Sequence, residues 1–547
     1  MAHRDEEFYR RAEAFIERML AEAPVAATHL GDHRYDDRLG QHTPEDIERQ
    51  VAYLKEALRE LEGLSPEELS PEAGIDREVL LGIVRSFLRD FKKLRGFARD
   101  PGIYSGECLG GVFSLIVRDF APLPERLKSV LGRLREVPRV LEEGKGNIVP
   151  EEVPRVWCEV AIESASQGIA LFTMLIPALA EQAPEIKGEL LSASREAAAA
   201  MEEYVGFLEA EVLPKASGDF AVGKDLFEEM LRENHMLDYT ADELLELGRE
   251  LFRKTKEEME LVAAEISPDK SARDILEEAK GDHPAAEELL DAYRREMERA
   301  KRFVVEKDIV SIPAGERLRL EPTPPFLAPV IPYAAYMPPG PLERVQEGIF
   351  LVTPVPPGAP EELKEEKLRG HHWAKIPVTA LHEAYPGHHL QLCYANRVGK
   401  LPRKLAGFLS SLFVEGWAFY CEELMERLGF IGEPIQRLGR LNDQLWRAAR
   451  IILDVSLHTR GMSVEEGVKF LVEEVGLERA NALAEVRRYT ASPTQPMSYL
   501  VGKLEILKLI EEFKEKSPGK AMRELHDAIL SCGSLPPRLM RRCLGLS

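Results

Sequence analysis

A short run of histidines around one glutamate is the part of this chain best suited to chemistry. Residues 381–391 read Leu-His-Glu-Ala-Tyr-Pro-Gly-His-His-Leu-Gln. In the zinc motif H-E-x-x-H, two histidines one helical turn apart bind the metal, and the glutamate activates a bound water. Here the residue four places after His382 is Pro386, and the next imidazoles are His388 and His389. The residue types fit a zinc hydrolase, but the spacing differs from the usual one.

The unusual spacing has a local explanation in Pro386 and Gly387. On an ideal helix, His388 would lie about 120° off the face of His382, and His389 would lie about 10.5 Å along the axis. Pro386 lacks an amide hydrogen and its ring clashes with the carbonyl of His382, while Gly387 adds backbone freedom. We therefore expect a helix that bulges across residues 384–387 and brings His388 to the place of the usual second histidine. His389 stays as the alternative ligand.

Histidines are concentrated in this part of the chain. Five of the 13 histidines lie between residues 371 and 389. The ordinary alternative to a metal site is a solvated helix end that carries exposed histidines. His371 and His372 precede the run, and we do not expect them to be ligands.

A tetrahedral catalytic zinc needs a third protein ligand and one open position for water. The strongest candidate is Glu415, in the helical segment 404–428, where it follows an apolar face and stands among aromatic and small residues. A lone carboxylate is costly in such surroundings without a partner. The alternative is a carboxylate that pairs with an arginine or lies exposed at the helix edge.

Together these residues resemble the gluzincin metallopeptidases, the thermolysin-like clan. In that clan two histidines and a glutamate from a second helix bind zinc, and the glutamate of the H-E pair is the general base. The chain more closely resembles an uncharacterised prokaryotic family known only as a domain of unknown function. The motifs that carry this resemblance are H-E-x-x-P-G-H-H at residues 382–389 and E-G-W-A-x-Y at residues 415–420.

The resemblance extends over nearly the whole chain. It includes residues 27–31 near the start and residues 447–458, 488–502 and 525–536 in the C-terminal half. In that family the first histidine after Pro-Gly is the more regular one, which favours His388. The resemblance therefore implies Zn²⁺ held by His382, His388 and Glu415, with Glu383 as the general base.

The resemblance also implies residues that stabilise the oxyanion formed when water attacks a carbonyl. The helical gluzincins use a downstream histidine and tyrosine, and His458 and Tyr499 are the matching positions. The alternative for His458 is an interaction with the helix dipole or with Asp454. The alternative for Tyr499 is aromatic packing in the core.

Three arginines are further candidates near these positions. Arg488 could bind a substrate carboxylate through its planar fork, which would favour short peptides or an exopeptidase. An ion pair of Arg488 with Glu485 is the alternative and fits slightly better. Arg447 and Arg450 stand at helical spacing with Asp454, so we expect an internal salt-bridge ladder there.

The elements that must position these residues are mainly helices. Apolar periodicity predicts helices at 5–23, 44–63, 76–97, 123–145, 153–181, 184–214, 224–232 and 240–265, and again after 370. Residues 303–356 instead hold many prolines and β-type runs at 303–305, 318–320, 326–330 and 349–355. The run 349–355 could pair with a peptide substrate by edge addition.

The predicted fold class is mostly α, a large helical metallopeptidase-like fold with a small β element before the active-site helix. We expect a single unit over residues 1–547. It would consist of an N-terminal helical half (1–302), a small β or extended segment (303–356) and a catalytic helical half (357–547). The cleft is expected between the two helical halves.

Composition excludes some classes of partner. The formal net charge is −22 and the isoelectric point is near 5.3, which argues against nucleic acid and anionic membrane surfaces. The first residues lack an apolar signal-peptide core, and no run of about 18 apolar residues is evident. The six cysteines form no C-x-x-C pair. These observations predict a cytoplasmic protein without a membrane partner, and they leave the oligomeric state open.

The sequence thus predicts a zinc-dependent metallopeptidase that acts on short peptides. One alternative is a zinc amidase or another hydrolase that cleaves a non-peptide amide. A second alternative, from a different class, is a catalytically inactive helical scaffold that binds peptides or partner proteins.

Overall fold

The computed structural model of the protein describes residues 2–324, 331, 333–356 and 358–546. The chain divides into two compact units. Unit 1 comprises Met1–Phe220 and Gly340–Val345, and unit 2 comprises Ala221–Pro339 and Gln346–Ser547. Helices make up 70% of the fold, so the mostly-α prediction is confirmed. All of the predicted site residues fall in unit 2.

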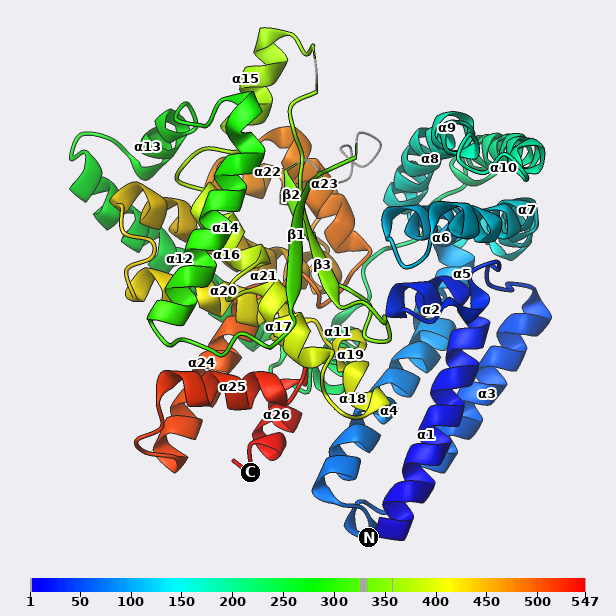
Figure 1. The fold of residues 1–547 in the computed structure, drawn as a ribbon, viewed down its shortest axis with the longest axis horizontal. Coiled ribbons are helices and arrows are strands. Elements are labelled where there is room, and N and C mark those ends of the chain that lie inside the picture. The colour runs from blue at the N-terminus through cyan, green and yellow to red at the C-terminus, as the bar shows by residue number, and fades with distance from the viewer. Residues whose placement is uncertain (1, 325–330, 332, 357, 547) are drawn as a thin grey trace. The chain divides into compact units, whose positions relative to one another are not determined.

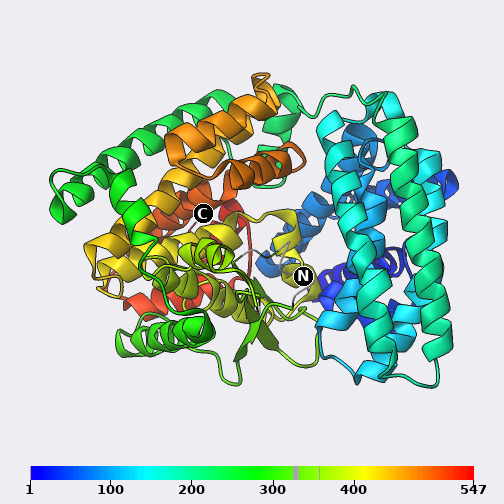
Figure 2. The same cartoon turned by 90° about the horizontal axis from the view of Figure 1, so that it is seen from above.

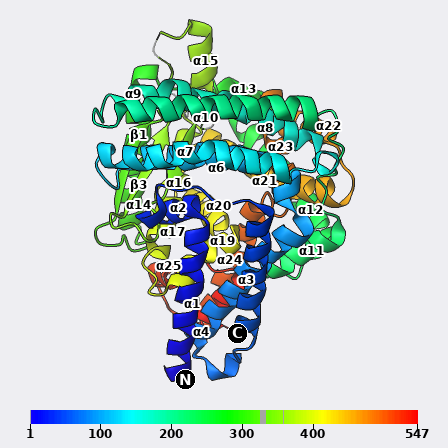
Figure 3. The same cartoon turned by 90° about the vertical axis from the view of Figure 1, so that its right-hand side faces the viewer.

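Unit 1 is entirely helical in its described part. Its α-helices are α1 (Ala2–Glu22), α2 (Pro24–Leu30), α3 (Pro44–Glu62), α4 (Pro71–Arg89), α5 (Gly96–Arg99), α6 (Gly102–Val117), α7 (Leu123–Asn147), α8 (Arg155–Ala170), α9 (Ile176–Ala180) and α10 (Lys187–Phe207). Helices α6, α7, α8 and α10 pack alongside one another (Figures 2 and 3) around a core that includes Tyr104, Leu134 and Tyr204.

One helical stretch of unit 1 differs from the sequence prediction. By length and composition, Arg155–Ala180 is apolar enough to cross a membrane, which the sequence analysis did not expect. Its inner residues Cys158, Ala165 and Phe172 belong to the core of unit 1. Only 22% of its most apolar 18-residue window is buried, so one face of the stretch packs on this core and the rest does not.

Unit 2 contains sixteen α-helices among its described residues and one small sheet (Figure 1). The helices are α11 (Lys224–Glu233), α12 (Ala241–Ile266), α13 (Ala272–Ala279), α14 (Leu289–Glu306), α15 (Glu361–Arg369), α16 (Ile376–Glu383), α17 (His388–Ala395), α18 (Leu401–Lys404), α19 (Ala406–Leu409), α20 (Leu412–Arg427), α21 (Pro434–Thr459), α22 (Val464–Phe470), α23 (Arg479–Thr490), α24 (Ser498–Lys516), α25 (Met522–Ser531) and α26 (Pro537–Cys543). Helix α12 packs against α21, and α20 packs against α24. Buried side chains such as Phe419, Ile451 and Leu500 form the core between these helices.

The sheet has the strand order β1-β3-β2, with β1 (Arg317–Pro322), β2 (Ala334–Met337) and β3 (Glu347–Val352). Strand β3 pairs in parallel with β1 and antiparallel with β2. The predicted run 349–355 therefore falls largely in the central strand. The interpretation that it offers a free edge to a peptide is wrong, because both of its edges are already paired.

Two of the predicted β-type runs do not correspond to a described strand. Residues 303–305 belong to the last turn of α14 and not to a strand. Val304 is fully buried on the same helical face as Met297 and Ala300, so packing of that face overrides the β propensity of the valines. The run 326–330 lies outside the described residues.

Candidate metal centre

The first part of the site is the break between α16 and α17. Helix α16 ends at Glu383, and α17 begins at His388. The predicted bulged helix is therefore a complete interruption. Pro386 has no amide hydrogen to offer the carbonyl of His382, so the helical hydrogen-bond pattern cannot continue. The amide of Gly387 instead donates to the carbonyl of Leu381 at 3.1 Å.

Gly387 is required by a close approach of two backbone segments. A Cβ atom at this position would overlap the carbonyl of His382. The four residues 384–387 thus form a tight turn that brings His388, at the start of α17, close to His382, near the end of α16. As a result, the rings of His382 and His388 lie edge to face with centroids 4.7 Å apart.

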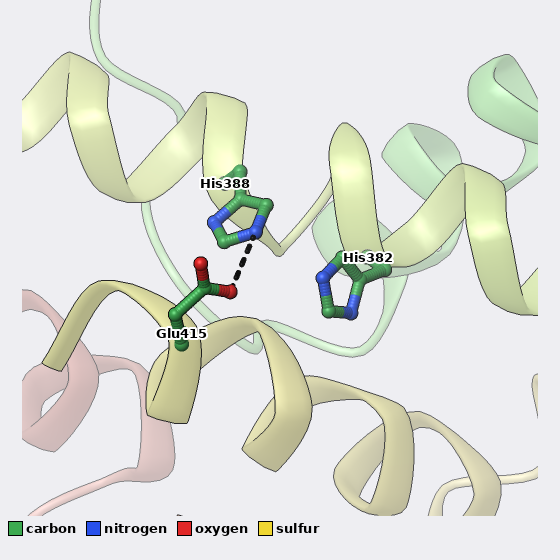
Figure 4. A group of neighbouring side chains, drawn as sticks. All are labelled: His382, His388 and Glu415. Carbon is green, nitrogen blue, oxygen red and sulfur yellow. Dashed lines mark ion pairs between the residues drawn. The ribbon is translucent and has the colours of Figure 1, made fainter. Parts of the chain in front are cut away.

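The third side chain comes from α20. Glu415 lies in the first turn of this helix and points at the two imidazoles (Figure 4). Its Oε2 atom is 3.6 Å from Nε2 of His388. One ligand atom from each of His382, His388 and Glu415 can be chosen so that all three atoms lie within 4.8 Å of one another. The three predicted ligands are thus brought together by the fold.

The E-G-W-A motif explains why α20 takes this position. Trp417 donates its indole N–H to the carbonyl of Pro386 at 2.8 Å, which fixes the turn against the helix. Gly416 packs against Gly502 of α24 so closely that a Cβ would overlap its backbone. The motif therefore supplies a candidate ligand, a close helix contact and a hydrogen bond to the turn in three consecutive residues.

A carboxylate that sequence reasoning missed orients His382. The Oε1 atom of Glu422 accepts a hydrogen bond from Nδ1 of His382 at 2.7 Å, and Glu422 is buried. With the proton on Nδ1, the Nε2 lone pair is left for a metal, as in many zinc sites. The signal in the sequence was the spacing, because Glu422 is seven residues after Glu415 and hence on the same face of α20.

The electrostatics of the site favour a cation. Burial by itself would lower the pKa of His382, but the hydrogen bond to Glu422 and the charges of Glu422 and Glu383 raise it above its ordinary value. Burial would raise the pKa of Glu415, but His388, His382 and Arg450 lower it to about 2. Glu415 is therefore a carboxylate at neutral pH, and the surroundings of His382 favour positive charge.

Buried polar atoms without partners also indicate that His382, His388 and Glu415 could hold a metal ion. Among the described residues, Nδ1 of His388 and Oε2 of Glu422 are buried without a hydrogen-bond partner. Buried polar atoms of this kind are normally satisfied by water or a ligand. Two imidazoles and one carboxylate with a fourth position open are a common ligand set for catalytic zinc. The residues present fit such an ion.

The neighbouring His389 has a different environment. Its Nε2 is 2.6 Å from Oε2 of Glu316, and its Nδ1 is 3.0 Å from the hydroxyl of Tyr336. The same carboxylate accepts the hydroxyl hydrogen of Tyr385 at 2.7 Å and pairs with Lys301. Both ring nitrogens are thus used within the protein, which leaves His388 as the histidine available to a metal.

Glu383 is the residue predicted to act as general base. It is the last residue of α16, next to His382. Within the described part of the chain, no hydrogen bond or ion pair engages its carboxylate, although its charge acts on His382. Its side chain is therefore open to a water or a substrate.

The other predicted residues lie on α21, α23 and α24. Burial and, to a smaller extent, the charge of Glu415 raise the pKa of Tyr499, so its hydroxyl keeps its hydrogen. His458 is fully buried, and its Nε2 donates to the carbonyl of Tyr489 at 3.0 Å. Arg488 pairs with Glu485 at 3.0 Å and donates to Gln495 at 2.9 Å, which is the alternative that the sequence favoured.

The predicted salt-bridge ladder around Asp454 is wrong. Asp454 is fully buried and accepts hydrogen bonds from the amides of Thr494 and Met497. Arg447 pairs with Asp443 and Arg450 pairs with Glu485. Helical spacing alone could not distinguish these partners, because α23 and the turn before α24 supply most of them.

Comparison with known proteins gives the family. The family described as "Bacterial protein of unknown function (DUF885)" matches residues 24–544. The chain belongs to this family. No curated protein is significantly similar to it.

Two solved structures share the fold over almost the whole chain. One is described as "a putative lipoprotein of unknown function" from Shewanella oneidensis, with 26% identity and a TM-score of 0.82 over 99% of this chain and 100% of that one. The other is "the putative lipoprotein" from Colwellia psychrerythraea, with 17% identity and a TM-score of 0.83 over 99% and 98%. The predicted cytoplasmic location is wrong on this finding, since both descriptions name lipoproteins, which are anchored to membranes.

Proposed function

We propose that this member of the family is a zinc-dependent metallopeptidase that hydrolyses short peptides. The observation that carries the proposal is the convergence of His382, His388 and Glu415 within 4.8 Å, with His382 oriented by Glu422. Imidazole and carboxylate donors are typical of zinc, and three protein ligands leave one position for water. The ligand side chains are only 11%, 13% and 18% exposed, which suits a short or extended chain better than a folded protein.

Each of the remaining residues has a proposed task. Zinc bound at this site would make a water molecule acidic enough to lose a proton near neutral pH. Glu383 would accept that proton and pass it to the leaving amine. Tyr499 would donate its hydroxyl hydrogen to the oxygen of the attacked carbonyl, since its raised pKa keeps it protonated. The donor role of His458 is the less supported, because its Nε2 hydrogen is already given to the carbonyl of Tyr489.

Two experiments test the proposal. Elemental analysis of the purified protein should give one zinc per chain, and digestion of a peptide library should yield cleaved products by mass spectrometry. Stoichiometric zinc without peptide cleavage would favour the amidase alternative, to be tested on N-acyl amines. The absence of tightly bound metal would favour the inactive scaffold.

The location proposed for the protein follows the relative from Shewanella oneidensis. That relative covers 99% of this chain at 26% identity and is described as a lipoprotein. We therefore propose that this protein works at the cell envelope, where short peptides from outside the cell are accessible. Fractionation of the native organism with an antibody against the chain tests this location.

A further inference from the structure

Two arginines of α21 lie beside the metal centre with donor atoms left over. Arg450 is 4% exposed, and its Nη1 is buried without a hydrogen-bond partner among the described residues. The side chain of Arg447 is 13% exposed, and its Nε is likewise buried without a hydrogen-bond partner among the described residues. A buried guanidinium hydrogen without an acceptor is costly, so an acceptor from outside the chain would be favoured there.

Aromatic rings hold both guanidinium groups by their faces. The Cζ atom of Arg450 lies 4.4 Å from the ring centre of Tyr499 and 4.5 Å from that of Trp446. The Cζ atom of Arg447 lies 4.7 Å from Trp446 and 5.6 Å from Tyr499. A ring beside a guanidinium attracts its charge without using its N–H groups, so Nη1 of Arg450 and Nε of Arg447 still have no partner among the described residues.

Each of these arginines has a carboxylate partner, but one partner is shared. Glu485 is shared between Arg450 at 3.1 Å and Arg488 at 3.0 Å. Arg447 pairs with Asp443 at 3.2 Å. Among the described residues the three guanidinium groups thus form ion pairs with two carboxylates, and the charge of Glu415 also acts on Arg450.

The cluster is close to the metal ligands. The charge of Arg450 acts on Glu415, and the charge of Arg447 acts on His382. Arg447 also lies 5.8 Å from the ring of Phe419, one turn after Glu415 on α20. Tyr499, which contacts both arginines, is itself influenced by Glu415. The unpartnered donors of Arg450 and Arg447 are thus near the place where an amide would be cleaved.

We propose that Arg447 and Arg450 form an anion subsite that binds the free terminal carboxylate of the substrate. This inference rests on the proposed function and deepens it, because it selects peptides cut next to their carboxyl end. One unpartnered donor from each arginine, Nη1 of Arg450 and Nε of Arg447, could bind one carboxylate by charge-assisted hydrogen bonds. Arg488, which the sequence suggested for this task, is 40% exposed at its side chain and already bound to Glu485 and Gln495.

The test uses binding in place of turnover. The full-length Glu383→Gln variant, loaded with zinc, is equilibrated with a mixture of tripeptides that carry free carboxylates, and separately with the same mixture as terminal carboxamides. Bound peptide is quantified by mass spectrometry after dialysis. We expect the acids to bind at least about tenfold more tightly, since hydrogen bonds to charged groups are the stronger ones.

Substitutions then locate the subsite. In the same background, Arg450→Gln should bring the acid-to-amide ratio close to one, and Arg447→Gln should lower it severalfold. Arg437→Gln is the matched control, because Arg437 is also on α21 but pairs with Glu258 and Glu426. If Arg450→Gln fails to fold, Arg447→Gln still decides the question, because it leaves the contacts of Arg450 with Glu485 and Tyr489 intact.

The outcomes separate this inference from the proposed function. Equal binding of acids and amides, binding of neither mixture, or an unchanged ratio in both variants would overturn the subsite. If the wild-type enzyme cleaves acids and amides alike, the peptidase stands and the subsite falls. If acids bind selectively but no peptide is ever cleaved, the subsite stands and the peptidase falls.

Discussion

The metal centre and the network around His389 use the same residue types in opposite ways. His388 and His389 are adjacent in sequence, and each lies near a glutamate whose pKa is lowered to about 2. At His389 the protein supplies a hydrogen-bond partner for both ring nitrogens. At His388 one nitrogen is near Glu415 and the other has no partner among the described residues. The two groups therefore differ in one respect: the protein provides a hydrogen-bond partner for every ring nitrogen of His389 but, among the described residues, not for Nδ1 of His388.

The largest effect expected from this contrast is on metal content. His388→Ala and Glu415→Ala should each lose bound zinc and all detectable turnover, because each removes one of three ligands. His389→Ala, the matched control one residue away, should keep stoichiometric zinc. Elemental analysis of the three variants checks this, and zinc loss in His389→Ala with retention in His388→Ala would reverse the assignment.

A large effect on turnover alone is expected for the general base. Glu383→Gln keeps the shape of the side chain but cannot accept a proton, so kcat should fall by about 10²–10⁴-fold. Zinc content should not change, because Glu383 is not among the three ligands. Kinetics on the best library peptide measure the effect. Activity near the wild-type level would remove Glu383 from the mechanism.

A moderate effect is expected from the carboxylate behind His382. Glu422→Gln removes the charge that orients the ring and favours its metal-binding form. Residues that hydrogen-bond to a metal-binding histidine contribute roughly 10–100-fold to metal affinity. Competition with a chromogenic chelator measures the zinc dissociation constant, and an unchanged constant would mean that Glu422 only fills space.

The smallest effect is expected in the His389 network, and it is on stability. Burial would raise the pKa of Glu316, but His389, Lys301 and Tyr385 lower it to about 2, against an ordinary value of 4.5. A lowered pKa stabilises the fold above pH 4.5, and this stabilisation is lost as the pH falls toward 2. The shift corresponds to at most about 3 kcal/mol.

Chemical denaturation at several pH values tests the size and sign of this term. The wild type should lose free energy of unfolding between pH 4.5 and 2 more steeply than Glu316→Gln. At neutral pH the variant should be less stable yet keep its zinc. Equal pH dependence of the two proteins would show that the network contributes little.

Much of the fold and of the site was predictable from local patterns. The helix at 240–265 was expected from its apolar periodicity, and in the structure Thr240 and Glu243 form a capping box at its start. His382, His388 and Glu415 were expected as a group, and they do converge. Glu422 and the arginine cluster were missed, because a buried carboxylate and a spare guanidinium donor are defined by their neighbours in space.

The sequence alone determined the helical periodicity, the break that Pro386 and Gly387 impose, and the types of donor atoms available. These follow from backbone sterics and side-chain chemistry, which act over a few residues. Only the tertiary structure placed His388 and not His389 beside Glu415, paired Glu422 with His382, and made β3 a central strand. Each of these depends on which distant segment supplies or withholds a hydrogen-bond partner.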